Sequence, residues 1–298
     1  MKRLKVQGVI VPLLTPIAGD TIDQDGFARL IEFVIERGVS GLFPLGTTGE
    51  GPLFTAEERK RGAEWVVRHT AGRVPVIIHT GMITTTETID VTRHARDVGA
   101  DAAAVVPPYF YTLTEEALFD HFAAVAKAAP DFPIYLYNNP GVTPNALSTK
   151  LVVQLAESFE NIIGLKDSGG GLATLFRSRE LHGGAFNTAS GPDGLILAAQ
   201  AIGVDACVSG NANVAPELVV GIVNAAKAGD YDRARTLQAR LDQVRAILAD
   251  GADLSLYKAM CAKRGVPIGD VRAPLRKATA ERIDACWEQF NDILSLPI

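Results

Sequence analysis

The 298-residue chain has few cysteines, few aromatic residues and no long hydrophobic run. Its three cysteines, Cys207, Cys261 and Cys286, lie far apart without metal-ligand spacing, which predicts reduced thiols in a cytoplasmic protein. The longest apolar stretches fall well short of the ~20 residues that a membrane span requires. No such run follows Met1 before Pro12, so we also expect no signal peptide.

An excess of positive charge is absent as well. The chain has 29 Lys and Arg against 34 Asp and Glu, a net charge of −5, which argues against a partner such as nucleic acid or an anionic membrane. With 47% hydrophobic and 21% charged residues it is not a disordered chain. A chain of this length buries about 70–75% of its unfolded surface, so its core needs no disulfide and no metal. We expect neither a metal site nor a cofactor.

Short apolar runs, most of them rich in β-branched residues, recur along the chain. They are continuous rather than alternating, which is typical of parallel strands that are buried on both faces. The eight predicted strands are Val6–Leu13, Gly41–Leu45, Val74–His79, Ala102–Val106, Pro133–Tyr137, Ile162–Leu165, Ala185–Ala189 and Asp205–Val208.

Segments with helical spacing lie between these runs, and Thr55, Thr114 and Ser148 precede three of them as N-caps. Eight strands that alternate with helices predict an α/β fold, a (β/α)8 TIM barrel over residues 1–225. An open doubly wound sheet is the alternative, but no Gly-rich dinucleotide motif follows the first strand. Further helices predict a C-terminal helical extension over residues 226–298, at Asp230–Asp250, Leu254–Arg264 and Thr279–Leu294.

Lys166 is the first candidate for chemistry, because active sites of barrels lie at the carboxyl ends of the strands. It follows the run Ile162–Leu165, where its ammonium would sit in a partly apolar cavity. Desolvation disfavours the charged form, lowers the pKa and leaves a free amine that can attack a carbonyl carbon. The alternative is a lysine that turns into solvent and pairs with Asp167. The residue pattern alone leaves both interpretations open.

Two further strand ends carry candidates. Tyr137 ends its run on the neighbouring strand, where it is either a proton relay beside Lys166 or a core tyrosine with a satisfied hydroxyl. The segment Gly46-Thr47-Thr48-Gly49-Glu50 closes the second strand. Its small residues let backbone N–H groups and two hydroxyls approach a ligand carboxylate, although an ordinary tight turn has the same composition.

Five motifs occur in the order in which one protein family carries them: Gly46–Glu50, Tyr137–Pro140, Gly164–Asp167, Ser190–Asp193 and Ala212–Ala215. In this order, the chain resembles the dihydrodipicolinate synthase / N-acetylneuraminate lyase family of pyruvate-dependent class I aldolases over nearly its whole length. The resemblance implies a barrel enzyme without a metal or cofactor. It also implies a homo-oligomer, commonly a tetramer.

The resemblance assigns roles to individual residues. Lys166 would condense with the keto carbon of pyruvate or another 2-oxo acid, and Tyr137 would relay protons. The segment Gly46-Thr47-Thr48 would hold the carboxylate of that 2-oxo acid. Val208 and Gly191 match positions that line the pocket near the Schiff base.

The chain departs from the synthases at two places. Val142 stands five residues after Tyr137, where synthases carry an arginine that clamps the carboxylate of the aldehyde. The loss of such an arginine weakens recognition of that substrate. Phe110 stands where synthases carry a relay tyrosine that crosses the subunit interface. Either Tyr109 or Tyr111, on its two sides, takes this role or the relay is absent.

The sialic acid lyases fit imperfectly too, because Gly194 follows Asp193 where those enzymes carry a second acid. The stretch Lys166–Gly170 resembles 4-hydroxy-2-oxoglutarate and 2-keto-3-deoxy sugar acid aldolases more closely. The favoured function is therefore a Schiff-base lyase that cleaves, or in reverse forms, a 2-oxo acid from pyruvate and an aldehyde. The alternatives are a 2-keto-3-deoxy sugar acid dehydratase, a dihydrodipicolinate synthase, and a non-catalytic barrel, which the phenylalanine at position 110 motivates.

Overall fold

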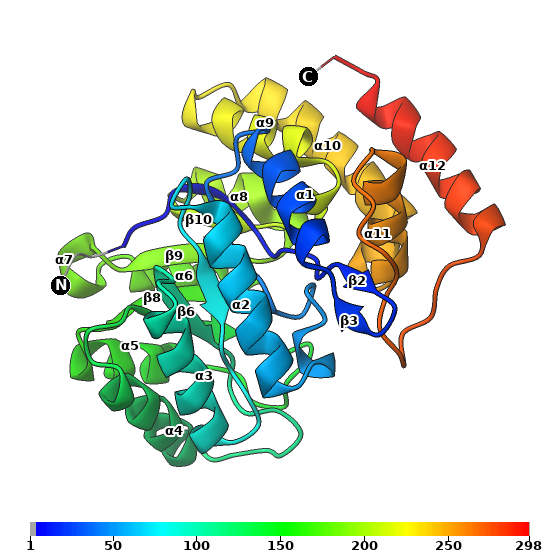
Figure 1. Cartoon of the computed structure of the whole chain (residues 1–298). Helices are drawn as coiled ribbons and strands as arrows, with labels where there is room; N and C mark the ends of the chain where they lie inside the picture. The colour runs from blue at the N-terminus through cyan, green and yellow to red at the C-terminus, as the bar shows by residue number, and fades with distance from the viewer. Residues whose placement is uncertain (1–3, 298) are drawn as a thin grey trace.

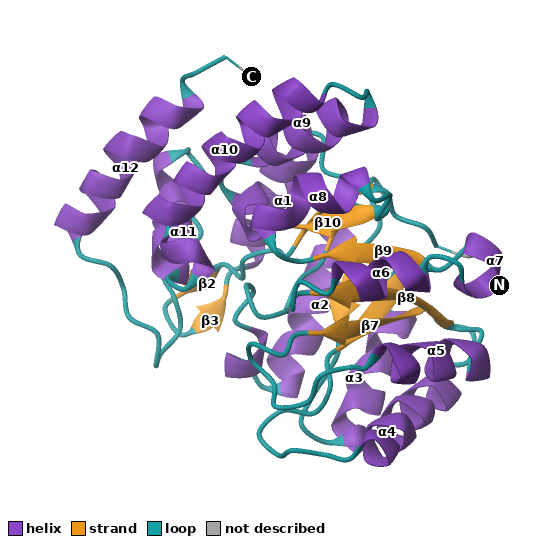
Figure 2. Cartoon of the chain, turned by 180° about the vertical axis from the view of Figure 1, so that it is seen from behind, coloured by secondary structure: helices purple, strands orange, loops and turns teal. Residues whose placement is uncertain are grey.

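Eight parallel strands form the centre of the protein in the computed structural model, which describes residues 4–297 (Figures 1 and 2). The strands follow the order β4-β1-β10-β9-β8-β7-β6-β5, and a parallel bridge between Leu42 and Val76 closes the circle. The predicted (β/α)8 barrel is confirmed. Its strands are β1 (Gly8–Val11), β4 (Gly41–Leu42), β5 (Ile77–His79), β6 (Ala102–Val105), β7 (Ile134–Asn138), β8 (Ile162–Asp167), β9 (Asn187–Ser190) and β10 (Ala206–Val208).

Helices cover the outside of the barrel between successive strands (Figure 2). The predicted N-caps Thr55, Thr114 and Ser148 each accept a hydrogen bond from a backbone N–H of the first turn. Thr55 also forms a full capping box with Glu58. The helices are α1 (Gln24–Ile35), α2 (Ala56–Thr70), α3 (Thr85–Asp97), α4 (Glu115–Ala128), α5 (Thr149–Ser158), α6 (Leu172–Ser178), α7 (Leu181–Gly184), α8 (Ile196–Ala201) and α9 (Pro216–Lys227).

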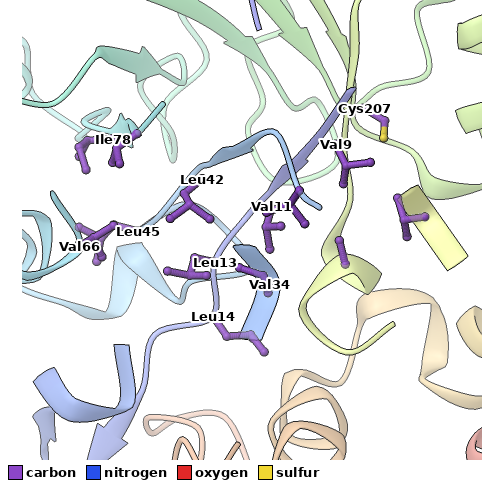
Figure 3. Close-up of a cluster of buried hydrophobic side chains, with 14 of the residues drawn as sticks. Val9, Val11, Leu13, Leu14, Val34, Leu42, Leu45, Val66, Ile78 and Cys207 are labelled. Carbon is purple, nitrogen blue, oxygen red and sulfur yellow. The ribbon is translucent and has the colours of Figure 1, made fainter. Parts of the chain in front are cut away.

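The strands are apolar on both faces because each face packs against a different layer. Figure 3 shows the outward-facing side chains of Val9, Val11 and Leu42 in one cluster with Val34 of α1 and Val66 of α2. The alternate residues form a second cluster inside the barrel, which includes Ile10, Phe43, Tyr135 and Tyr137. This double burial explains why the apolar runs of the sequence are continuous.

Two local features differ from the sequence-based expectation. The structure has an antiparallel hairpin of β2 (Ile17–Ala18) and β3 (Thr21–Ile22) after β1, and strands of two residues are too short to show a period. Strand β8 also continues through Lys166 and Asp167, which stay in register with β7 and β9. Their polarity marks a strand end in the sequence, yet the backbone pairing extends past it.

Three further α-helices follow the barrel: α10 (Tyr231–Ile247), α11 (Leu254–Lys263) and α12 (Ala280–Leu294). They lie together on one side of the barrel in both views, with α10 beside α9 (Figures 1 and 2). The predicted C-terminal helical extension is confirmed, and the predicted boundary at residue 225 falls in the last turn of α9. None of the helices within residues 4–297 is long and apolar enough to cross a membrane.

Candidate active site

A cavity of about 330 Å³ opens at the carboxyl ends of the strands. The barrel and the C-terminal helices both contribute to its walls. The lining residues that carry the following argument are Thr47, Thr48, Tyr137, Asn139, Lys166, Gly191, Asp193, Val208, Asn211, Arg245, Asp250 and Tyr257. The position at the carboxyl ends is the one that barrel enzymes use for catalysis.

Lys166 is buried at the bottom of this cavity, with 5% of its surface exposed. Its Nζ lies 3.8 Å from the centroid of the Tyr137 ring and 4.2 Å from that of the Phe43 ring. Burial lowers the pKa of Lys166, and the attraction of Tyr137 opposes this shift only in part. The site therefore favours a neutral amine more than water does.

Asp167 does not neutralise this lysine. Adjacent residues of a strand point to opposite faces, and the Asp167 carboxylate turns toward the loop that follows. It accepts hydrogen bonds from Asn138 Nδ2 at 2.8 Å and from the backbone N–H groups of Gly169 and Gly171 at 2.8 and 3.1 Å. The alternative of a solvent-exposed Lys166 paired with Asp167 does not hold in the structure.

Tyr137 lies beside Lys166 because the two residues are partners in the parallel pairing of β7 and β8. Its hydroxyl accepts a hydrogen bond from Asn139 Nδ2 at 2.8 Å and lies 3.4 Å from Thr47 Oγ1. Burial alone raises the pKa of Tyr137, but Lys166 and the hydrogen bonds of Thr47 and Ser168 outweigh it, so the pKa is lowered. The phenol is thus linked both to the Lys166 amine and to the loop that carries Thr47 and Thr48, which we call the threonine loop.

The loop after β4 presents Thr47 and Thr48 to the cavity. Two backbone hydrogen bonds fix its shape, from Glu50 N to Thr47 O at 3.1 Å and from Gly51 N to Gly46 O at 2.9 Å. Gly46 does not line the cavity. A Cβ atom at this position would lie 2.8 Å from the Phe43 ring, so the glycine allows close packing beneath the loop.

A second group of polar side chains lines the cavity. Tyr257 of α11 donates to Asn211 Oδ1 at 3.1 Å, and Asn211 Nδ2 donates to Asp193 Oδ2 at 2.5 Å. Burial raises the pKa of Asp193. Arg245 of α10 pairs with Asp250 at 3.1 Å, and its Nη1 occupies the space above Gly194, 2.5 Å from where a Cβ atom would lie.

The other predicted residues divide into two groups. Val208 and Gly191 line the cavity as expected. The aromatic segment after β6 does not line it: Tyr109 is half-buried, whereas Phe110 and Tyr111 are 79% and 66% exposed. In a single chain these two rings contact each other and face outward.

Sequence reasoning missed several residues of the site. Asn139 lies within the motif Tyr137–Pro140, but no role was assigned to it from the sequence. Phe43 lies within the predicted apolar strand Gly41–Leu45, where its sequence context does not distinguish it from an ordinary core residue. Arg245 and Tyr257 come from the C-terminal helices, and no local pattern places these helices over the barrel mouth.

The fold and the position of the cavity define a barrel enzyme, and comparisons with known proteins narrow the class. A 4-hydroxy-tetrahydrodipicolinate synthase from Bartonella bacilliformis is 37% identical over 287 residues, which are 95% of this chain and 97% of that protein. Two solved structures share the fold. A prophage protein of the dihydrodipicolinic acid synthase family from E. coli, in complex with pyruvate, has a TM-score of 0.90 at 32% identity and covers 96% of this chain and 98% of its own. A Proteus mirabilis N-acetylneuraminate lyase has a TM-score of 0.92 at 26% identity, with 98% and 100% covered.

Two of these relatives are named as a synthase and a lyase, and the protein is a lyase of the aldolase type. Residues 5–291 match the sequence model of the Dihydrodipicolinate synthetase family. The chain belongs to this family, as its resemblance in sequence motifs predicted.

Proposed function

We propose that the protein is a Schiff-base lyase that acts on a 2-oxo acid, with Lys166 as the nucleophile. The observation that carries this proposal is the buried Lys166 amine, 3.8 Å from the centre of the Tyr137 ring, in a polar cavity. The amine attacks the keto carbon, and the resulting carbinolamine loses water to form an iminium ion. Tyr137 supplies and accepts the protons of these steps.

Cleavage then uses the iminium nitrogen as the electron sink. A base removes the proton of the C4 hydroxyl, the C3–C4 bond breaks, and an aldehyde leaves. The electron pair of the broken bond forms the C2=C3 double bond of an enamine, and the nitrogen takes up the electron pair of the C=N bond. Protonation of C3 restores the iminium ion, and its hydrolysis releases pyruvate and the free lysine. The Tyr137 hydroxyl, held by Asn139 and close to Thr47, is the candidate for the proton transfers.

The carboxylate of the 2-oxo acid would bind at Thr47 and Thr48. Both residues line the cavity, and Thr47 Oγ1 lies 3.4 Å from the Tyr137 hydroxyl. Their hydroxyl and backbone N–H groups are suitable donors. The net charge of −5 gives no general attraction for an anion, so this recognition has to be local.

The substrate class we propose is a hydroxylated 2-oxo acid, such as a 2-keto-3-deoxy sugar acid or 4-hydroxy-2-oxoglutarate. The polar groups of Asp193, Asn211 and Tyr257, which line the cavity, suit a hydroxylated tail. Val142 offers no cation to the carboxylate of aspartate semialdehyde, which disfavours the synthase reaction. The named synthase relative supports that reaction as the second candidate. A dehydratase on the same scaffold would use the same lysine.

Reductive trapping tests the central step. The protein is incubated with pyruvate and borohydride, and the adduct is measured by intact mass. We expect one adduct in the wild-type protein and none in Lys166→Ala. Lys150→Ala removes a lysine on α5 whose side chain is 81% exposed and should keep the adduct. An adduct that survives Lys166→Ala would disprove the assignment. Product analysis with a 2-keto-3-deoxy sugar acid separates the two reactions, because a lyase releases pyruvate and a dehydratase does not.

We further propose that the protein is a cytoplasmic homotetramer in which the exposed rings of Phe110 and Tyr111 are covered by another subunit. Light scattering coupled to size exclusion measures the mass directly. The tetramer should weaken in Phe110→Asp, because a charge cannot be buried there without a partner. A monomeric wild-type protein would overturn this part of the proposal.

A further inference from the structure

A fully buried ion pair connects the C-terminal extension to the threonine loop. Lys258 of α11 places its Nζ 2.6 Å from Glu50 Oε1, and the exposed fractions of the two side chains are 1% and 0%. Glu50 directly follows the segment Gly46–Gly49 at the mouth of the barrel. The two charges are thus taken from water at the point where the extension meets the cavity loop.

Backbone groups of the extension hold both partners. Lys258 Nζ donates to the Asp270 carbonyl at 2.7 Å, and the backbone N–H of Arg272 donates to Glu50 Oε2 at 2.7 Å. Each oxygen of the Glu50 carboxylate therefore has a partner from the C-terminal part of the chain. The carboxylate is held from two sides and has little freedom to move.

A backbone hydrogen bond connects Glu50 directly to Thr47. The Glu50 backbone is in the left-handed region, with φ at +55°, and its N–H donates to the Thr47 carbonyl at 3.1 Å. A non-glycine residue adopts this conformation only at a cost, so other contacts must hold it there.

The loop on either side of Glu50 is packed against backbone. A Cβ atom at Gly49 would lie 2.8 Å from the Leu13 carbonyl oxygen, and one at Gly51 would lie 1.9 Å from that of Leu45. Thr15 Oγ1 also donates to the Gly49 carbonyl at 2.6 Å. With so little space around the loop, a shift of Glu50 has to move the turn that carries Thr47 and Thr48.

We propose that Lys258 and Glu50 are positioning residues that set the geometry of the threonine loop, so that the C-terminal extension determines the affinity for the 2-oxo acid carboxylate. This inference rests on the proposed role of Thr47 and Thr48. A buried ion pair is weak evidence for a stabilising role, because a neutral pair of similar volume often serves the fold equally well. Its functional effect can therefore be separated from folding.

The test compares variants that keep the interior neutral. A single replacement would leave one buried charge unpaired and threaten the fold, so Glu50→Gln and Lys258→Met are combined. The glutamine keeps an acceptor for the Arg272 N–H. The matched control combines Lys263→Met and Asp284→Asn, which removes a 2.7 Å pair between α11 and α12 whose side chains are 37% and 68% exposed.

We expect the Glu50→Gln/Lys258→Met variant to unfold at nearly the wild-type temperature and to need about tenfold more pyruvate for half-maximal borohydride trapping. The trapping rate at saturating pyruvate should stay within about threefold, because Lys166 itself is untouched. The Lys263→Met/Asp284→Asn control should match wild type in both quantities. A purely structural pair would leave the pyruvate requirement unchanged.

A second variant covers the case in which the double variant does not fold. Lys258→Arg keeps the charge but changes the position of its donors, and it should also raise the pyruvate requirement. An unchanged requirement in whichever variant folds overturns the inference, and so does a loss of the saturating rate alone. If wild type itself forms no adduct, the proposed function fails first, and this inference falls with it.

Discussion

Tyr137 and Lys166 are direct partners across the parallel strands β7 and β8, and the Lys166 Nζ lies 3.8 Å from the centre of the Tyr137 ring. Each residue affects the protonation of the other. The lysine lowers the pKa of the buried phenol, and the phenol opposes the fall in the pKa of the buried lysine. Replacement of the phenol should therefore change how the rate of Schiff-base formation depends on pH.

Tyr137→Phe should shift the pH profile of Lys166 to lower pH. Trapping with pyruvate needs the neutral amine, so its rate rises with pH through the pKa of Lys166. Burial places this midpoint below the usual lysine value of about 10.4, and the removal of the phenol leaves burial less opposed. The midpoint should therefore fall further, while turnover drops by about 10²–10⁴.

The measurement is the trapping rate as a function of pH for wild type, Tyr137→Phe and Tyr231→Phe. Tyr231 is an exposed residue at the start of α10, and its replacement should leave the profile unchanged. A midpoint that rises or stays constant in Tyr137→Phe would contradict the coupling.

The sequence was sufficient for the parts of the site that lie within or directly after a strand. Lys166, Tyr137 and Thr47 stand at ends of apolar runs, and the barrel rule alone brings such ends together. Arg245 and Tyr257 could not be found in this way. They come from helices whose docking depends on long-range packing, and the charge of Arg245 is typical of any surface helix.

Arg245→Met should affect substrates with a polar tail but not pyruvate. Arg245 lines the cavity from α10, pairs with Asp250 at 3.1 Å and fills the space above Gly194. We expect KM for a 2-keto-3-deoxy sugar acid to rise about tenfold, which corresponds to one charged hydrogen bond. Half-maximal trapping with pyruvate should need the same concentration as in wild type.

The matched control is Arg235→Met on the same helix, whose side chain is 63% exposed and pairs with Asp232. Steady-state kinetics with the sugar acid and borohydride trapping with pyruvate measure the two effects. An equal change for pyruvate and for the sugar acid would show that Arg245 acts on the fold of the site rather than on the tail.

Val142→Arg should increase activity with aspartate semialdehyde. Val142 is 54% exposed, and its backbone N–H donates to the Asn139 carbonyl beside the cavity. An arginine there would supply the cation that the resemblance to the synthases implies at this position. We expect kcat/KM for aspartate semialdehyde with pyruvate to rise about 10–100-fold, the range of a charge-assisted hydrogen bond.

Val142→Gln adds a polar side chain of intermediate length without a charge and should give little of this gain. A coupled assay with pyruvate and aspartate semialdehyde measures all three proteins. If wild type already matches a synthase and Val142→Arg adds nothing, the lyase assignment gives way to the synthase.

The buried His121 should make the free energy of unfolding depend on pH. This residue of α4 is 4% exposed, and its Nδ1 lies 2.9 Å from Thr85 Oγ1. Burial lowers the pKa of His121 to about 4, whereas an unfolded histidine titrates near 6.5. Between these values the unfolded chain binds the proton and the folded chain does not, so the free energy of unfolding must decrease as pH falls from about 6.5 to 4.

The full shift corresponds to about 3 kcal/mol of stability, present above pH 6.5 and lost by pH 4. In His121→Gln, urea unfolding at pH 7, 5.5 and 4.5 should show a loss that is smaller by up to this amount. A wild-type slope in His121→Gln would mean that His121 is protonated in the folded protein and that other groups cause the acid sensitivity.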